Sequence, residues 1–322
     1  MEYKKKETIT IGKKRGREAK INYDLYGDDN APFKILFVMG FLQSGEAWKL
    51  QIDYFRKNKD FQICVYDNRG INNSTSFSLS LKEMAFDAVD LLDHLNWKNN
   101  INICGASLGG SIVTHICNII PDRINSAIIS APHIGLFSPF ISLGKKKFCK
   151  SFFIKNDREK YYTLISSIFS DEHLNSPSVS EPNKTKVQAM IDRAIKNKDK
   201  TPNPSIITLF SHLYIYISTK FTNKDFNNIR KNNINVLVLG GEKDVLIPLN
   251  CLKKDFVERL QTKNFKIFKT GHCINLEKPK DFNETISDHI TKKNLNLQHY
   301  YNDTNSKRYF NFLSIKRFLK FK

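Results

Sequence analysis

The eight residues ICGASLGG, from Ile103 to Gly110, place one hydroxyl among three nearby glycines, directly after an apolar run. They place Ser107 in a Gly-x-Ser-x-Gly pattern between an apolar run, residues 101–104, and an apolar helical segment, residues 108–120. A serine in a glycine-framed turn between a strand and a helix is typical of a nucleophile elbow, where the backbone is strained and the hydroxyl projects above a sheet. The helix that begins just beyond it favours negative charge nearby. The pattern predicts a catalytic serine, although similar turns also serve packing and phosphate binding.

A serine hydroxyl is a weak nucleophile unless a base takes its proton, so a histidine and an orienting carboxylate are expected later in the chain. Asp244 follows the apolar run 234–241, and His272 follows the run that begins at Phe265. Each has an ordinary explanation by itself, since Asp244 could cap the next helix and His272 could be a plain loop residue. Together they complete the order Ser107, Asp244, His272 expected for this architecture, and so predict a catalytic triad.

Short apolar or β-branched runs that end at turn residues predict strands buried on both faces. Helical patterns lie between several of them, most clearly over residues 80–95, where Ser80 and Glu83 are expected to form a capping box. This alternation predicts an α/β fold with a mostly parallel sheet flanked by helices. Two earlier segments, 7–11 and 19–27, alternate in polarity and are expected to form an antiparallel edge. The six predicted strands are residues 34–40, 61–67, 101–107, 124–130, 234–241 and 265–271.

The alternation of strands and helices stops between the fourth and fifth predicted strands, where the sequence consists of aromatic and lysine-rich helical stretches. We expect residues 135–233 to form a helical cap inserted over the sheet. Residues 1–134 and 234–294 then form the core, because the strand pattern resumes at Ile234. Residues 295–322 are expected to be a basic amphipathic tail.

These motifs resemble the α/β-hydrolase fold superfamily, in its serine esterase and lipase-like branch, over about residues 21–290. The resemblance rests on the elbow and on two further segments, FVMGFLQSGEAW (residues 37–48) and VYDNRGINNST (residues 65–75). It implies an oxyanion hole made by the backbone N–H groups of Phe41 and Leu108. Many relatives carry histidine where this chain has Met39, so a side chain that often supports the oxyanion loop is missing. In the second segment, Asp67 and Arg69 are implied to fix a loop through hydrogen bonds and ion pairs.

Relatives that open epoxides or remove halides carry aspartate at the elbow, so Ser107 excludes those reactions. The remaining chemistry is acyl transfer through a serine ester. We expect a serine hydrolase that cleaves a carboxylic ester or thioester, with a small hydrophobic substrate, because the cap is rich in apolar and aromatic residues. No cofactor or metal is expected. An acyltransferase using the same triad, or a catalytically weak binding protein of this fold, is the alternative.

The formal net charge of +19 would suit an anionic partner, but lysine, asparagine and isoleucine abound along the whole chain, as an AT-rich genome would produce. Nucleic acid is not an expected partner, because no nucleic-acid-binding motif is present. Residues 307–322 interleave aromatic and basic side chains, which suits a helix at an anionic membrane surface. An equally weighted alternative is a terminal helix packed on the body or an unstructured tail. Six scattered cysteines favour free thiols in a reducing compartment. With no signal peptide or apolar span, we expect a cytoplasmic protein, in peripheral contact with a membrane if the tail binds one.

Overall fold

The computed structural model describes residues 3–72, 74–133, 143–198 and 205–291. The predicted tail, residues 295–322, lies outside this part of the chain. Within the described residues, no helix has both the length and the apolar character needed to cross a bilayer.

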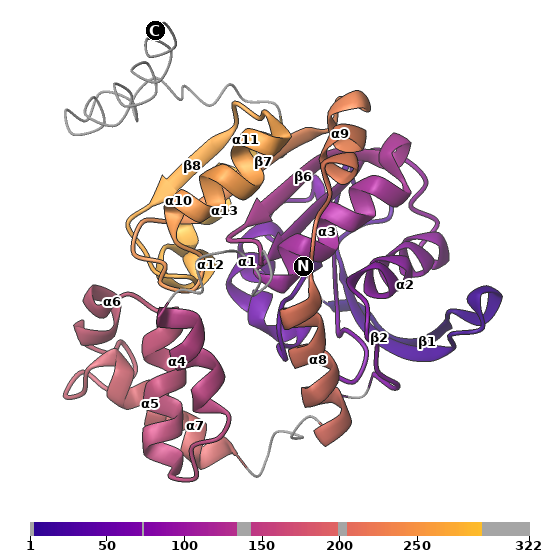
Figure 1. Ribbon diagram of the computed structural model, residues 1–322. Helices are drawn as coiled ribbons and strands as arrows, with labels where there is room; N and C mark the ends of the chain where they lie inside the picture. The colour runs from indigo at the N-terminus through magenta and orange to yellow at the C-terminus, as the bar shows by residue number, and fades with distance from the viewer. Residues whose placement is uncertain (1–2, 73, 134–142, 199–204, 292–322) are drawn as a thin grey trace, which may run out of the picture.

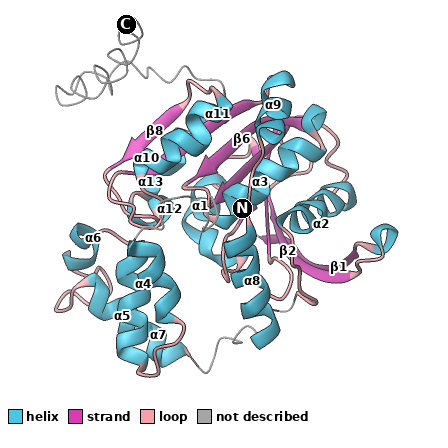
Figure 2. Cartoon of the chain, viewed as in Figure 1, coloured by secondary structure: helices cyan, strands magenta, loops and turns pink. Residues whose placement is uncertain are grey.

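An eight-stranded sheet crosses the protein in the order β1-β2-β4-β3-β5-β6-β7-β8 (Figures 1 and 2). Neighbouring strands from β4 to β8 pair in parallel, whereas β2 is antiparallel to both β1 and β4. This confirms the predicted α/β fold, its mostly parallel sheet and its antiparallel edge. The strands are β1 (Tyr3–Ile11), β2 (Ala19–Tyr26), β3 (Phe33–Val38), β4 (Phe61–Tyr66), β5 (Ile101–Ala106), β6 (Ile124–Ser130), β7 (Asn235–Gly241) and β8 (Phe265–Phe268).

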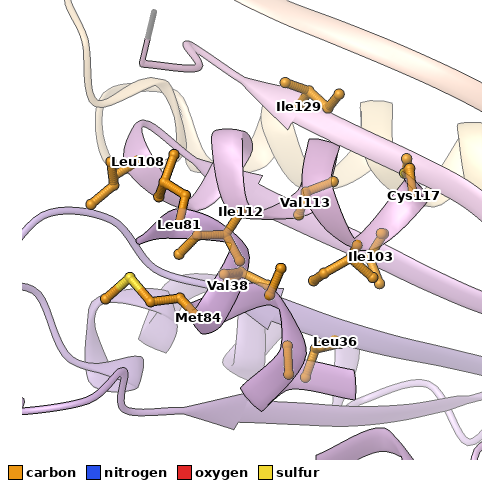
Figure 3. Packing of buried hydrophobic residues seen from close by; sticks show 14 of the residues in the cluster. Leu36, Val38, Leu81, Met84, Ile103, Leu108, Ile112, Val113, Cys117 and Ile129 are labelled. Atoms are coloured by element: carbon orange, nitrogen blue, oxygen red, sulfur yellow. The ribbon is translucent and has the colours of Figure 1, made fainter. Parts of the chain in front are cut away.

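Helices cover both faces of the sheet because successive strand side chains point to opposite sides. On β3, Leu36 and Val38 belong to the core shared with the helices on one face, while Ile35 and Phe37 belong to the core on the other. Figure 3 shows the first of these cores closely packed. The helices are α1 (Lys49–Phe55), α2 (Leu81–His94), α3 (Leu108–Ile119), α4 (Leu143–Ser151), α5 (Asp157–Ile168), α6 (Asp171–Asn175), α7 (Lys186–Asn197), α8 (Ile206–Ser218), α9 (Asn223–Lys231), α10 (Leu249–Leu252), α11 (Glu258–Leu260), α12 (Ile274–Glu277) and α13 (Pro279–Ile290).

The insertion between β6 and β7 carries the helices α4 to α9. Figure 1 shows α4, α5, α6 and α7 grouped together at one end of the molecule, away from the sheet, with α5 packed on α4 and α7. By contrast, α9 packs on α3 and α11 and so joins a layer that covers the sheet. The predicted cap, residues 135–233, therefore contains a group of helices set apart from the sheet, α4 to α7, and one helix, α9, that packs against the core.

The predicted capping box at the start of α2 is wrong. Ser80 is the residue before the helix, but its side chain makes no capping bond. The hydroxyl of Ser78 lies 2.7 Å from the Glu83 carboxylate and also accepts the N–H of Ser80 at 3.1 Å. Glu83 faces the buried Arg69 as well, at 3.8 Å. These contacts hold the Glu83 carboxylate, so Ser80 has no reciprocal partner.

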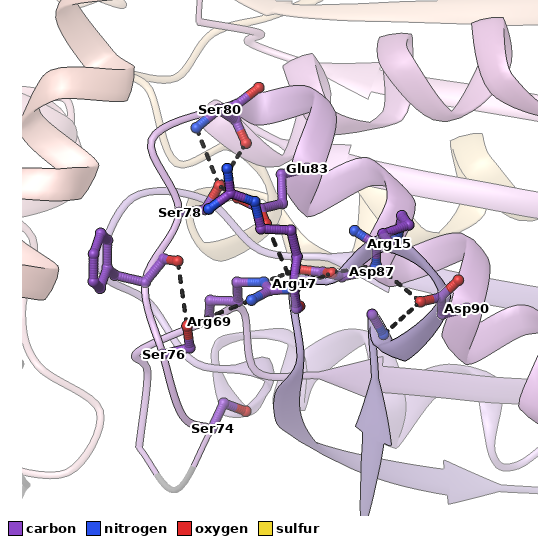
Figure 4. Close-up of polar contacts among 12 residues, drawn as sticks. Arg15, Arg17, Arg69, Ser74, Ser76, Ser78, Ser80, Glu83, Asp87 and Asp90 are labelled. Carbon is purple, nitrogen blue, oxygen red and sulfur yellow. Dashed lines mark hydrogen bonds and ion pairs between the residues drawn. The ribbon is translucent and has the colours of Figure 1, made fainter.

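A buried ionic network ties the β1–β2 turn to the loop after β4 and to α2 (Figure 4). The Arg69 side chain is 1% exposed, and its guanidinium donates to both oxygens of Asp87 at 2.5 and 2.8 Å. Arg15 joins the network through Asp87 and Asp90, each at 2.8 Å. Asp67 accepts the N–H of Gly45 at 2.8 Å. The loop-fixing role expected of Asp67 and Arg69 is confirmed.

Removing the shared carboxylate would leave two arginines without their central partner. We expect Asp87→Ala to lower the free energy of unfolding by about 3–5 kcal/mol, because a buried charge is left uncompensated. Asp93→Ala is the control, since Asp93 is 49% exposed and pairs with Arg123 at the surface; its loss should cost no more than about 1 kcal/mol. Urea unfolding measures both, and equal small losses would contradict the role given to Asp87.

Candidate active site

Ser107 sits in a sharp turn between the end of β5 and the start of α3, with φ 56° and ψ −122°. This backbone conformation is strained for any residue other than glycine and persists only where the surroundings enforce it. A Cβ on Gly109 would lie 2.1 Å from the Val38 carbonyl oxygen, and one on Gly105 would lie 2.3 Å from the Gly109 oxygen. The glycines of the motif are therefore required by close backbone contacts, and the strained turn predicted from sequence is confirmed.

His272 and Asp244 form a hydrogen-bonded pair at the ends of β8 and β7. The Nδ1 atom of His272 lies 2.8 Å from Oδ2 of Asp244, and both side chains are buried. The other carboxylate oxygen accepts the backbone N–H groups of Leu246 and Ile247, at 2.8 and 2.9 Å. Asp244 thus both shapes its own loop and orients the imidazole. Because Nδ1 is engaged, Nε2 is the ring nitrogen left to exchange a proton.

Ser107 and His272 line one pocket of about 130 Å³. Among the hydrogen bonds of the described residues, none joins the Ser107 hydroxyl to the imidazole. The walls come from the loop after β3, from cap residues and from the histidine loop. Besides these two residues, the lining consists of Met39, Gly40, Phe41, Leu42, Gln43, Ala106, Phe148, Phe152, Leu164, Ile168, Tyr216, Leu246, Cys273 and Asn275.

The two backbone groups expected to form an oxyanion hole come from loops that touch each other. An ideal Cβ on Gly40 would lie 3.2 Å from the Leu108 nitrogen and 3.2 Å from the Ser107 Cβ, so the loop that carries Phe41 runs directly against the elbow. Leu108 is the first residue of α3, where a backbone N–H has no acceptor within the helix. The loop that carries Phe41 therefore lies against the elbow that carries Leu108, and Phe41 also lines the pocket.

Two side chains hold the loop after β3, residues 39–43, in place. We call it the oxyanion loop, after the role expected of Phe41. Asn68 donates to the Met39 carbonyl at 2.9 Å, and the Leu42 N–H donates to Nδ1 of His212 at 3.3 Å. His212 comes from α8 and is fully buried. Burial lowers the pKa of His212 to about 4, so the ring stays neutral and able to accept a hydrogen bond near neutral pH. Sequence analysis missed His212, although a lone histidine in the apolar stretch LFSHLYIYI was a usable signal.

The Phe41 side chain also anchors the cap. Its ring makes edge contacts at centroid distances of 5.6 to 5.8 Å with four rings of the insertion, Phe148, Phe152, His212 and Tyr216. Such edge-to-face pairs stabilise packing beyond the area that they bury. Phe41, whose backbone N–H is the expected oxyanion donor, is therefore held in position by the packing of its side chain.

The cap holds the histidine loop as well. The His272 N–H donates to the carbonyl of Ile168, the last residue of α5, at 2.9 Å. Glu277 accepts the N–H of Gly271 at 2.8 Å and that of Ser170 at 3.1 Å, so one carboxylate joins the histidine loop to the start of α6. Both the oxyanion loop and the histidine loop thus depend on contacts with the insertion.

Comparison with known proteins identifies one matching family and many similar structures. The family model described as the alpha/beta hydrolase fold matches residues 35–279. No curated protein matches the sequence.

Solved structures similar to this chain include three whose names describe hydrolytic enzymes. A thermophilic esterase from Thermogutta terrifontis has a TM-score of 0.67 and 18% identity, over 90% of this chain and 99% of that one. An enol-lactonase from Burkholderia xenovorans has a TM-score of 0.67 and 17% identity, over 88% and 100%. A meta-cleavage product hydrolase from Pseudomonas fluorescens has a TM-score of 0.66 and 15% identity, over 91% and 99%. At these identities the likeness shows a shared fold.

Proposed function

Because this chain belongs to the α/β-hydrolase fold family, we propose that it is a serine hydrolase that cleaves a carboxylic ester through an acyl-enzyme intermediate. His272, which is paired with Asp244 at 2.8 Å, lines the same pocket as a serine held in a strained strand-to-helix turn, and this arrangement is the main support for the proposal. A nucleophile, a base and a group that orients the base are the parts that acyl transfer requires.

In the proposed reaction, the Ser107 hydroxyl attacks the ester carbonyl carbon while Nε2 of His272 takes the hydroxyl proton. Negative charge then develops on the carbonyl oxygen, where the N–H groups of Phe41 and Leu108 stabilise it. Collapse of this intermediate expels the alcohol, which receives the proton from the imidazolium. Water repeats the sequence on the acyl-enzyme and releases the acid. Asp244 keeps the imidazole oriented and stabilises its charged form.

The size and the lining of the pocket favour a substrate with a small apolar acyl group. Its volume of about 130 Å³ is close to that of a cavity that holds one benzene molecule, roughly 150 Å³. Phe148, Phe152, Leu164 and Ile168 from the insertion contribute apolar lining. The names of the esterase and the enol-lactonase among the similar structures are in line with ester cleavage. We therefore propose esters of short aliphatic or single-ring acids as substrates.

The triad is tested by hydrolysis of p-nitrophenyl butyrate. We expect Ser107→Ala and His272→Ala each to lower kcat by roughly 10³-fold or more, and Asp244→Asn to lower it less, because the base is then misoriented but still present. His94→Ala is the matched control, since His94 lies on α2 and is 41% exposed. Full turnover by Ser107→Ala would contradict the proposal, and an unchanged rate in Asp244→Asn would place the orienting acid elsewhere.

His212 is tested by the same assay as a residue that positions the oxyanion loop. His212→Leu removes the acceptor of the Leu42 N–H, and we expect kcat to fall roughly 10- to 100-fold with little change in KM, because the oxyanion forms only in the transition state. In His212→Asn, the side-chain oxygen can replace Nδ1, so most of the activity should remain. If leucine and asparagine lowered kcat equally, or if only KM changed, His212 would have a packing role alone.

A further inference from the structure

Helix α8 presents two different faces. One face is buried and supplies His212 to the oxyanion loop and Tyr216 to the pocket. The other face is apolar and exposed, with large side chains spaced one, three or four residues apart along the helix. We call this face the α8 stripe; it consists of Ile206, Ile207, Phe210, Tyr214 and Ile217, which are 39% to 73% exposed.

The α8 stripe is unusual for a surface helix because no charged residue interrupts it. The 13 residues IITLFSHLYIYIS contain no Lys, Arg, Asp or Glu, and their single histidine is on the buried face. Contiguous exposed apolar surface of this kind marks a site that contacts another molecule or a membrane.

The loop before α2 packs against the buried side of α8, at Thr208. A Cβ on Gly70 would lie 2.4 Å from the Thr208 hydroxyl and 3.1 Å from the Ser76 carbonyl, so α8 and this loop meet at one point. The next residues of the loop, Phe77 and Leu79, are 46% and 54% exposed. Two further large apolar side chains therefore emerge close to the N-terminal half of α8.

A basic turn adjoins this loop. The guanidinium of Arg69 donates to the Arg17 carbonyl at 2.6 Å and to the Ser76 hydroxyl at 3.5 Å, which links the β1–β2 turn to the loop. Arg17 also lines one groove together with Phe77 and Leu79. We call Lys13, Lys14 and Arg17, all exposed, the basic turn. Two acidic side chains line the same groove, Glu83 and the exposed Glu18, and Glu83 faces the buried Arg69. The turn keeps a net positive charge, because its three exposed basic residues outnumber Glu18.

We propose that the α8 stripe, Phe77, Leu79 and the basic turn together form a docking surface for an anionic lipid bilayer. Apolar side chains flanked by lysine and arginine are the combination that seats a protein at the headgroup boundary, because apolar insertion and attraction to anionic lipid act together. A second copy of this chain is a poorer occupant, since each copy carries a formal net charge of +19 and repels the other.

Membrane docking would be a second role for α8, separate from its contacts with the proposed active site. Docking through the stripe would place the helix that carries His212 and Tyr216 at the membrane, where apolar esters accumulate. The docking surface is inferred from exposed side chains, charge and contacts, and none of these depends on the proposed hydrolysis. Membrane binding can therefore be measured without any turnover, and the result does not depend on whether the protein is an esterase.

The test is sedimentation of the full chain with vesicles of phosphatidylcholine and phosphatidylserine, compared with phosphatidylcholine alone. We expect binding to the anionic vesicles that weakens at high salt. Phe210→Glu combined with Tyr214→Glu should lower the partition coefficient at least tenfold, because two apolar groups can no longer insert. Lys13→Ser, Lys14→Ser and Arg17→Ser combined should abolish the preference for phosphatidylserine.

Matched controls change equally exposed residues elsewhere. Val179→Glu, at a position 93% exposed in the cap, and Lys57→Ser with Lys59→Ser, on the turn after α1, should bind as the unchanged protein does. Unfolding midpoints check that each variant is folded. Absence of vesicle binding, or binding that the stripe and basic-turn variants leave intact, overturns the proposal. So does a lipid-free dimer in analytical ultracentrifugation that the stripe variant dissociates, since the stripe would then be an interface between copies.

Discussion

The strained backbone at Ser107 fixes where the hydroxyl stands relative to the sheet and the pocket. A serine at φ 56° persists only if its neighbours fix the turn, and here they do so on three sides. The Ser107 N–H donates to Ser130 of β6 at 2.9 Å, and its carbonyl accepts the N–H of His133 at 3.1 Å. Gly109 packs on the Val38 carbonyl at the end of β3. The turn is thus bound to the two strands that flank β5, so the hydroxyl stands where the sheet ends.

The insertion completes this site as well as covering it. His212 accepts a hydrogen bond from the oxyanion loop, Ile168 accepts one from the His272 N–H, and Ser170 shares the Glu277 carboxylate with the histidine loop. Asn68 holds the same loop through the Met39 carbonyl, and His212 holds it through the Leu42 N–H. Cap packing and the geometry of the proposed chemistry are therefore coupled.

Local sequence patterns predicted much of this structure. Features that depend on contacts between residues far apart in the chain could not be predicted. The strands, the elbow and the order of Ser107, Asp244 and His272 were accessible because each depends on a short run of residues or on strand ends that must meet. His212 was not, because its partner Leu42 lies 170 residues away and only the folded insertion brings them together. The predicted capping box was wrong for a different, partly local reason: Glu83 accepts from Ser78, five residues earlier, and also faces the buried Arg69. The roles proposed for the triad and the oxyanion donors remain predictions.

A crystal structure of the protein after reaction with an alkyl fluorophosphonate would show directly whether Ser107 is the nucleophile of a site built jointly by the core and the insertion. We predict phosphorus bonded to Oγ of Ser107, with the phosphoryl oxygen about 3 Å from the backbone nitrogens of both Phe41 and Leu108. The alkyl group should lie in the pocket against Phe148 and Phe152. An adduct on another residue would show that Ser107 is not the nucleophile, and a phosphoryl oxygen turned away from both nitrogens would show that they do not form an oxyanion hole.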